Sequence, residues 1–355
     1  MDEALKALRE RIDSIDDSIL QLVSERAGIA QQVGHTKKGE KIYRPEREAQ
    51  IVRRLREANP GPLSGDVIER LIREVISACR ALEQTLRIAY LGPAGTFSQQ
   101  AVHKHFGHEA DALAEADIDA CFNAVETGRA DFAVVPVENS TEGAIARTLD
   151  LIVSSPLKIC SEVMLPIHQA LMRKHAGMEG IQRVYGHAQS LAQCQKWLGR
   201  HLPDAERVSV VSNSDGARRA AAEPDAATLG SASAAELYGL SVIEARVEDE
   251  VSNTTRFLVL GKTDAAPSGR DKTSLVMGAH NQPGAVVKLL QPLADAGISM
   301  SKLESRPARG SNWEYLFFVV CNGHREDPEL AAALREIEAR AAFLKVLGSY
   351  PAATS

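Results

Sequence analysis

The stretch LKALRERIDSIDDSILQLVSERAGIAQQV, residues 5–33, carries apolar side chains at alternating spacings of three and four. The apolar positions are Leu5, Leu8, Ile12, Ile15, Ile19, Leu22, Ile29 and Val33. This spacing predicts one amphipathic helix of about 30 residues. Because an exposed apolar stripe of this length is unfavourable in water, we expect the helix to pair with that of a second copy in a helical dimer.

Two shorter helices are expected after the long one. Pro45 interrupts the pattern, which resumes over residues 46–58. The run NPGP at 59–62 breaks the chain again. Apolar residues then recur at helical spacing over residues 68–86, which predicts a third helix. We therefore expect residues 1–86 to form an all-α domain.

Beyond residue 86 the pattern changes twice. Over residues 87–262 short apolar runs alternate with helical patterns, which is typical of an α/β domain with a partly parallel sheet. A segment of this size can form two lobes with a cleft between them. After a linker at 264–271, residues 272–350 follow the order strand–helix–strand–strand–helix–strand, which predicts an α+β ferredoxin-like domain. The chain is thus expected to be multidomain.

Composition and charge exclude several classes of protein. With 44% hydrophobic and 25% charged residues, the chain is typical of soluble globular proteins. Lys and Arg total 41 against 47 Asp and Glu, so a broad basic surface for nucleic acid is not expected. No run approaches the roughly 18 apolar residues of a membrane span. The N-terminus lacks the pattern of a secretory signal, and five scattered cysteines favour a reducing cytoplasm.

Charged residues continue the apolar seam of the helical region. Arg26 takes the next heptad position after Leu22, and Lys37 falls on the same side. Glu83 is expected to face inward from the third helix. Buried charges cost several kcal/mol each unless they are paired or bind a ligand. An internal salt bridge is one interpretation, and a small anionic ligand inside the helical assembly is the other.

Three segments of this helical region resemble the all-helical chorismate mutases. They are LRERIDSID at residues 8–16, SER at 24–26 and YRPERE at 43–48, together with Lys37. The resemblance covers residues 1 to about 86. It implies that Arg9, Arg26 and Lys37 hold the two carboxylates and the ether oxygen of chorismate. It also implies that Arg9 serves the partner's site in a dimer that shares its long helices.

The resemblance extends to the second and third helices. Arg47 and Glu48 match the family's pair of site residues on the second helix. Glu83 falls where the family places a donor beside the ether oxygen, and Cys79 where some members have Ser. Arg44 departs from an acid found in some members. Converting chorismate to prephenate needs a held conformer and a donor on the breaking oxygen. Since Glu83 donates only when protonated, mutase activity should fall as the pH rises.

Five polar clusters mark the α/β segment, each beside a predicted strand or helix end. They are GPAGTFS at 92–98, PVENSTEG at 136–143, HAQS at 187–190, SNSDG at 212–216 and SNTTRF at 252–257. Helix capping accounts for any one of them, but five in one domain favour convergence on a ligand cleft. Neither a dinucleotide-binding GxGxxG nor a P-loop sequence occurs.

Together the clusters resemble prephenate dehydratase over residues 87 to about 262. That family's fold is two α/β lobes similar to a periplasmic binding protein. The resemblance implies that prephenate loses carbon dioxide and its ring hydroxyl to give phenylpyruvate. Thr255 would donate to the departing hydroxyl, and Arg256 would anchor anionic groups. Further substrate contacts are expected from Thr96, Asn139, Ser140, Thr141, Gln189, Asn213 and Ser214.

Two motifs, NQPGAV at 281–286 and LESRP at 303–307, border predicted strands near the C-terminus. Turn chemistry is one interpretation. With the order of elements over residues 272 to about 350, they also resemble the ACT-type regulatory domain of prephenate dehydratases. This implies that phenylalanine binds at a dimer interface and lowers dehydratase activity. The expected effector-binding residues are Asn281, Gly284, Ala285, Val286, Glu304, Ser305 and Arg306.

The order of the three regions is similar to that of the bifunctional enzymes of phenylalanine biosynthesis. We therefore expect a cytoplasmic homo-oligomer, most simply a dimer. Its substrates would be chorismate and prephenate and its effector phenylalanine, without cofactor or metal. A non-catalytic two-lobed sensor with an effector domain is an alternative, and so is an enzyme active in one half only. Thr255→Ala separates enzyme from sensor, since only an enzyme would lose turnover while keeping affinity for prephenate.

Overall fold

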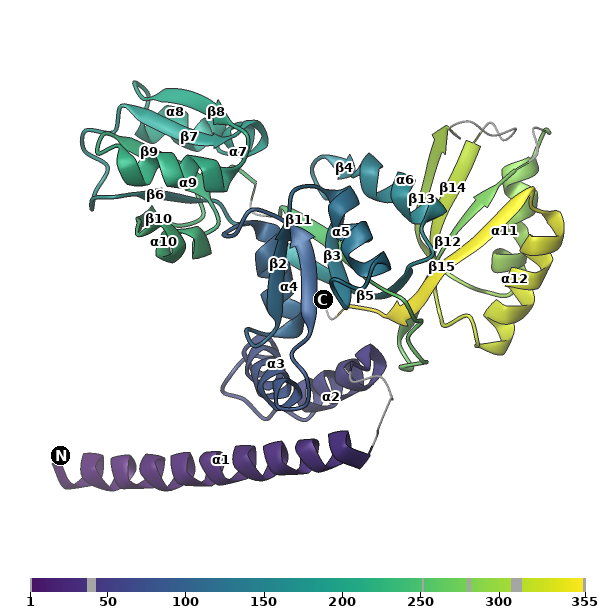
Figure 1. The fold of residues 1–355 in the computed structure, drawn as a ribbon, viewed down its shortest axis with the longest axis horizontal. Helices are drawn as coiled ribbons and strands as arrows, with labels where there is room; N and C mark the ends of the chain where they lie inside the picture. Colours follow the sequence, from purple (N-terminus) through teal and green to yellow (C-terminus); the bar gives the residue numbers. More distant parts are fainter. Residues whose placement is uncertain (1, 37–42, 251, 280–281, 308–314, 354–355) are drawn as a thin grey trace. The chain divides into compact units, whose positions relative to one another are not determined.

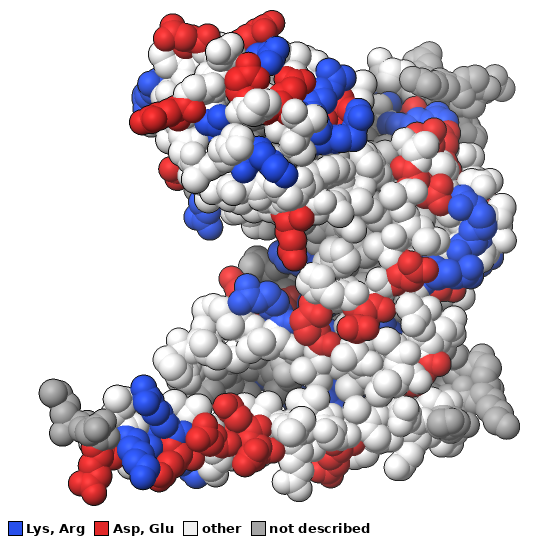
Figure 2. All heavy atoms as spheres, turned by 60° about the vertical axis from the view of Figure 1, so that its left-hand side comes forward, with Lys and Arg blue, Asp and Glu red and all other residues white. Residues whose placement is uncertain are grey.

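The computed structural model describes residues 2–36, 43–250, 252–279, 282–307 and 315–353 (Figure 1). The chain divides into two compact units. The first comprises Met1–Leu86 with His103–Asp111, and the second comprises Arg87–Val102 with Ala112–Ser355. Acidic and basic side chains lie interspersed over the face drawn in Figure 2. Of the described helices, none is both long and apolar enough to cross a membrane.

The first unit is helical, with α1 at Asp2–Thr36, α2 at Pro45–Glu57 and α3 at Gly65–Ala81. Ser64 caps α3, where its side chain accepts a hydrogen bond from the Val67 N–H. Helices α2 and α3 pack around Val52 and Ile76, which are 1% and 7% exposed. The all-α expectation for this region is confirmed.

The apolar stripe of α1 is exposed in the single chain. Leu8, Ile12 and Leu22 are 63%, 56% and 64% exposed. The helix contacts α3 near its C-terminal half, where Arg26 Nη1 donates to the Val75 carbonyl at 3.5 Å. An exposed apolar stripe of this size is unfavourable in water, and a second helix packed against it would cover it.

Helix α3 is shorter than the sequence pattern predicts. It ends at Ala81, so Glu83 lies in the following turn and is exposed. The expectation that Glu83 faces inward from a helix is therefore corrected. Leu86, predicted as the last helical position, is buried next to β1 instead. The chain leaves the helix early because it must enter that strand.

The second unit begins with two sheets. The first has the order β2-β1-β3-β11-β5, with β4 paired to β3, and the second has the order β10-β6-β9-β7-β8. The strands of the first are β1 Arg87–Leu91, β2 Asp111–Glu115, β3 Phe132–Asn139, β4 Gly143–Ala144, β5 Lys158–Pro166 and β11 Thr254–Gly261. Those of the second are β6 Ala170–Arg173, β7 Arg183–His187, β8 Glu206–Val210, β9 Ala226–Gly230 and β10 Ser241–Glu244.

Helices cover these sheets and connect their strands (Figure 1). Beside the first sheet are α4 Phe97–Phe106, α5 Ile118–Glu126 and α6 Ala146–Ser154; beside the second are α7 Ala188–Gln193, α8 Gln195–His201, α9 Asn213–Ala222 and α10 Ser233–Tyr238. The chain passes to the second sheet after β5 and returns in β11. Because β1 and β3 run parallel while β11 runs antiparallel to β3, the partly parallel sheet expected from the sequence is confirmed.

The C-terminal part is a four-stranded antiparallel sheet of order β13-β14-β12-β15. Its elements are β12 Asp271–Gly278, α11 Ala285–Asp295, β13 Met300–Pro307, β14 Tyr315–Asn322, α12 Pro328–Arg340 and β15 Phe343–Pro351. Both helices lie on one face of this sheet (Figure 1). The other face joins the core of the first sheet, since Phe318 and Tyr350 are buried in one cluster with Leu149 and Ile152.

Candidate active sites

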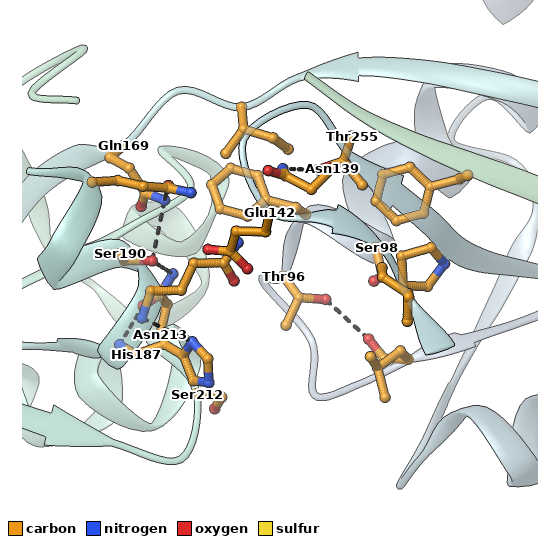
Figure 3. Close-up of a pocket in the computed structure, with 18 of the residues that line it drawn as sticks. Thr96, Ser98, Asn139, Glu142, Gln169, His187, Ser190, Ser212, Asn213 and Thr255 are labelled. Atoms are coloured by element: carbon orange, nitrogen blue, oxygen red, sulfur yellow. Dashed lines mark hydrogen bonds between the residues drawn. The ribbon is translucent and has the colours of Figure 1, made fainter. Parts of the chain in front are cut away.

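A cavity of about 420 Å³ lies between the two α/β lobes of the second unit. One side comes from β3, β11 and the loop before α4, and the other from β7, α7 and the start of α9. Five residues predicted from the sequence line it: Thr96, Asn139, Gln189, Asn213 and Thr255. Figure 3 shows Thr255 and Asn139 on one side and Gln169, Ser190 and Asn213 on the other, with Glu142 projecting between them.

Thr255 is held by an oriented amide. The Asn139 Oδ1 accepts from the Thr141 backbone N–H at 3.0 Å, which directs Nδ2 of the same amide toward Thr255. Asn139 Nδ2 then donates to Thr255 Oγ1 at 2.8 Å and to Asn253 Oδ1 at 2.9 Å. Since the Thr255 oxygen is the acceptor in this bond, its own proton remains available for donation to a group in the cavity.

The opposite side of the cavity carries a second polar network. Gln169 Nε2 and Asn213 Nδ2 both donate to Ser190 Oγ, at 3.1 and 2.8 Å. The His187 backbone N–H donates to Asn213 Oδ1 at 2.8 Å and fixes that amide. Neutral donors of this kind, convergent on a cavity, suit a carboxylate or hydroxyl ligand.

Several predicted contacts lie outside the cavity lining. Ser140 Oγ accepts from the Thr254 backbone N–H at 3.0 Å, and Thr141 closes a turn on Asn139. Ser214 donates to the Ala94 carbonyl at 2.9 Å, across the two lobes. These three side chains stabilise the loops that carry the lining residues, so the structure places them as supports of the site.

Arg256 points away from the cavity, which corrects the expectation that it anchors substrate anions. Successive side chains of a strand face opposite sides of the sheet, so Arg256 and Thr255 cannot share one face. Arg256 Nε donates to Glu162 at 2.8 Å, and Nη2 donates to Tyr350 Oη at 2.8 Å. Lys272 binds the same carboxylate at 2.7 Å.

The Glu162 carboxylate is fully buried in this cluster. Burial by itself raises the pKa of Glu162, but the charges of Arg256 and Lys272 offset that effect and leave the pKa below its usual value. Burial raises the pKa of Tyr350, so its phenol stays protonated. The cluster is therefore a satisfied ion pair beneath the strand that carries Thr255.

Residues that the sequence patterns did not single out complete the cavity. They include Ser98, Glu142, Gln169, His187, Ser190, Gln193 and Ser212. Ser98, Glu142, His187, Ser190 and Ser212 lie inside the polar clusters that the sequence shows, although they were not singled out. Gln169 and Gln193 lie in no such cluster; in the fold Gln169 Nε2 donates to Ser190 Oγ at 3.1 Å and to Gln193 Oε1 at 3.3 Å.

The residues expected to bind chorismate are spread over the first unit. Arg9 and Arg47 are exposed, Arg26 is half-buried against α3, and Cys79 is buried. Lys37 lies outside the described residues. Glu83 lies beside α1, where a Cβ added at Gly34 would come within 2.7 Å of its carboxylate.

Glu48 has a partner, Arg80, that the sequence patterns do not indicate. Arg80 Nη1 donates to its carboxylate at 2.5 Å, and Arg80 Nη2 donates to the Phe106 carbonyl at 2.7 Å. Arg80 is 7% exposed and lies over the rings of Tyr43 and Phe106. Such a buried, doubly bonded guanidinium fixes the direction of Glu48.

The expected effector residues fall into two groups. Gly284 has a φ of +76°, a conformation that favours glycine, and it begins α11 with Ala285 and Val286 in the first turn. Asn281 lies outside the described residues. On β13, Glu304 pairs with Lys302 at 3.0 Å, and Arg306 pairs with Asp150 at 3.1 Å.

Among the described residues, no group of three His, Cys, Asp or Glu side chains is placed to hold a metal ion.

Models of three families match successive regions of the chain. The model of chorismate mutase type II matches residues 8–84, that of prephenate dehydratase residues 88–265, and that of the ACT domain residues 273–339. A bifunctional chorismate mutase/prephenate dehydratase of Neisseria gonorrhoeae is 52% identical over 99% of this chain and 98% of the relative. One of Pseudomonas aeruginosa is 46% identical over the same shares of the two chains.

Solved structures resemble the second unit. A prephenate dehydratase from Arthrobacter aurescens in complex with L-Phe has a TM-score of 0.69 and 31% identity, and the match covers 75% of this chain and 90% of that one. A protein described as a quorum-quenching acylase has a TM-score of 0.70 and 30% identity over 75% of this chain and 98% of that one. Since relatives match nearly the whole chain at up to 52% identity, this chain belongs to the family of bifunctional chorismate mutase/prephenate dehydratases with a C-terminal ACT domain.

Proposed function

We propose that the chain converts chorismate to prephenate in its helical unit and prephenate to phenylpyruvate in the cavity between the α/β lobes. Phenylalanine, bound through the ACT domain, lowers the second activity. The observation that carries the proposal is the placement of Thr255 in that cavity, with Asn139 Nδ2 donating to its oxygen.

In the dehydratase step, the bond from the ring to the carboxylate breaks, and its electron pair moves into the ring. The bond between the ring and its hydroxyl oxygen breaks on the opposite side of the ring. The ring becomes aromatic, which drives the reaction. The Thr255 hydroxyl donates a hydrogen bond to the departing oxygen, which leaves as water after taking a proton from solvent. Because a threonine hydroxyl is a weak acid, its contribution is stabilisation of developing negative charge. The donors around Ser190 hold the carboxylates.

In the mutase step, the enzyme holds the flexible diacid in its reactive conformer. Arg26, Lys37 and Arg47 supply positive charge, Glu48 and Cys79 contact the substrate, and Glu83 lies beside the ether oxygen. Arg9 reaches the site of a second copy, because α1 pairs with α1 of the partner through its exposed apolar stripe. Leu8 and Leu22, at 63% and 64% exposed, support this dimer.

The effector site and the cellular location are also part of the proposal. Phenylalanine contacts Asn281, Gly284, Ala285 and Val286 and, from the second motif, the exposed Ser305, where two ACT domains meet. The cysteines of the chain are buried and far apart in sequence. Thiols of this kind suit a reducing compartment, so we place the enzyme in the cytoplasm.

The test is incubation of the purified chain with chorismate, with and without L-phenylalanine, while prephenate and phenylpyruvate are followed separately. We expect chorismate to be consumed, phenylpyruvate to accumulate, and L-phenylalanine to lower only the second rate. Binding of prephenate without turnover would identify a sensor. Turnover of chorismate without phenylpyruvate formation would leave an enzyme active in one half.

A further inference from the structure

The second effector motif lies on a strand with two different faces. Lys302, Glu304 and Arg306 alternate along β13 and are half-buried. Leu303 and Ser305, between them, are exposed. The half-buried side chains face the dehydratase lobe, where Lys302 Nζ lies 2.9 Å from Glu138 and Arg306 Nη1 lies 3.1 Å from Asp150. Only the outer face of the strand is therefore open to an added ligand or a second copy.

Arg306 and Lys345 hold the two ends of helix α6. Arg306 Nη1 donates to the Ala146 carbonyl at 2.7 Å, in the first turn, besides binding Asp150 one turn later. At the other end, Lys345 Nζ donates to the carbonyls of Ile152, Val153 and Ser155 at 3.0, 2.8 and 2.6 Å. A cation at the C-terminus of a helix satisfies carbonyls that lack partners within the helix. Both cations come from the ACT sheet.

The same helix fixes one wall of the dehydratase cavity. Residues Glu142–Ile145, directly before α6, line the cavity. The Ile145 backbone N–H donates to the Val137 carbonyl at 2.8 Å, and the buried Thr148 hydroxyl donates to the carbonyl of Pro136, which also lines the cavity, at 2.6 Å. A shift of α6 would therefore move this wall, while Thr255 on β11 is held separately through Asn139.

We propose that Arg306 and Lys345 are positioning residues for the dehydratase reaction: they hold α6, and through it the Glu142–Ile145 wall, in the arrangement that binds prephenate. The inference rests on the proposed function. It assigns Arg306 to the coupling between the ACT domain and the cavity and leaves the outer face of β13, with Ser305, for the effector. A ligand that moves β13 changes the cavity through α6.

The variants Arg306→Gln and Asp150→Asn test this on the full chain. Each removes one charge of the pair; Asp150→Asn keeps the size of the side chain, and Arg306→Gln shortens it. The matched control is Arg340→Gln: Arg340 also binds one carboxylate, of Glu336 at 2.7 Å, and one carbonyl, of Lys288 at 3.2 Å, but wholly within the ACT domain. The readouts are KM and kcat for prephenate, inhibition by L-phenylalanine, binding of L-phenylalanine by calorimetry, and mutase activity.

We expect both variants to raise KM for prephenate about tenfold with little change in kcat, because the wall moves and Thr255 does not. The double variant should be no worse than Arg306→Gln alone, since Arg306→Gln already removes the contact with Asp150. L-phenylalanine should still bind but inhibit less, and mutase activity and the control should match wild type.

Two results would overturn the inference. One is dehydratase kinetics and inhibition equal to those of the control, which would show that the contact does not position the cavity. The other is loss of L-phenylalanine binding in Arg306→Gln with unchanged KM for prephenate, which would make Arg306 an effector ligand. If wild type forms no phenylpyruvate from prephenate, the proposed function itself fails.

Discussion

The dehydratase cavity and the mutase residues differ in how far one chain completes them. Thr255 is 8% exposed, and its hydrogen-bond partner and the opposite wall of the cavity all belong to the same unit. The helix carrying Arg9 and Arg26 exposes its apolar stripe, with Ile12 at 56%. One copy of the chain thus builds the cleft between its two lobes by itself, whereas the site proposed on the exposed helix would be completed by a second copy.

The largest effect expected is on the dehydratase alone. Thr255→Ala removes the donor to the departing hydroxyl, and we expect kcat to fall by about 10²–10³-fold. The affinity for prephenate should change little, because the donors around Ser190 remain. Steady-state rates and binding of prephenate measure the two quantities, and mutase activity is the internal control. A variant with full dehydratase activity would remove Thr255 from the mechanism.

A smaller effect is expected from the amide that orients Thr255. Asn139→Ala removes the donor to Thr255 Oγ1, so the hydroxyl can rotate and point its proton away from the substrate. We expect kcat to fall about tenfold, the size of one neutral hydrogen bond. The double variant with Thr255→Ala should be no slower than Thr255→Ala alone. Additive losses would show that Asn139 acts independently of Thr255.

The smallest effect expected is a difference between the two units in how their stability depends on pH. His105 is fully buried, and burial holds the pKa of its imidazole well below the usual value. When the protein unfolds, the imidazole becomes free to take up a proton. Its contribution to the free energy of unfolding is therefore present above pH about 6.5 and falls by up to about 1.4 kcal/mol per pH unit as the pH drops. The pKa of Glu162 is also lowered. This carboxylate therefore adds to the free energy of unfolding above its unfolded pKa of about 4.3, and that contribution is lost at lower pH.

Calorimetric melts at pH 7.5, 6.0 and 5.0 measure this difference. The unfolding transition of the helical unit should move to lower temperature below pH 6.5. That of the second unit should keep its temperature until the pH falls below about 4.3. His105→Gln should flatten the first dependence. Equal slopes for wild type and the variant would contradict the assignment to His105.

The sequence predicted whole elements well where periodicity is long. The seam of residues 5–33 became α1, because a repeat of this length matches only a helix. The change of pattern after residue 86 coincides with the start of strand β1 at Arg87. Strands β6 and β7 are four and five residues long and buried along most of their length, so they show no alternation from which they could be predicted.

The candidate site was predictable in part. Thr255 was found through its motif, while strand alternation at β11 would already have separated it from Arg256. Gln169 follows β5 and Ser190 begins α7, and they meet only because the sheet order brings β6 and β7 together with β9 between them. Such long-range pairing has no local signal in the sequence.

The most direct test of the comparison mixes two inactive mutases. Arg9→Ala and Arg26→Ala are each expected to lose most mutase activity and to keep wild-type dehydratase activity. If Arg9 serves the partner's site, a mixed dimer has one intact site in two, and random exchange of copies should restore about a quarter of wild-type mutase activity. Mutase activity no greater than the average of the two parents, in a mixture shown to exchange copies, would contradict a site shared between chains.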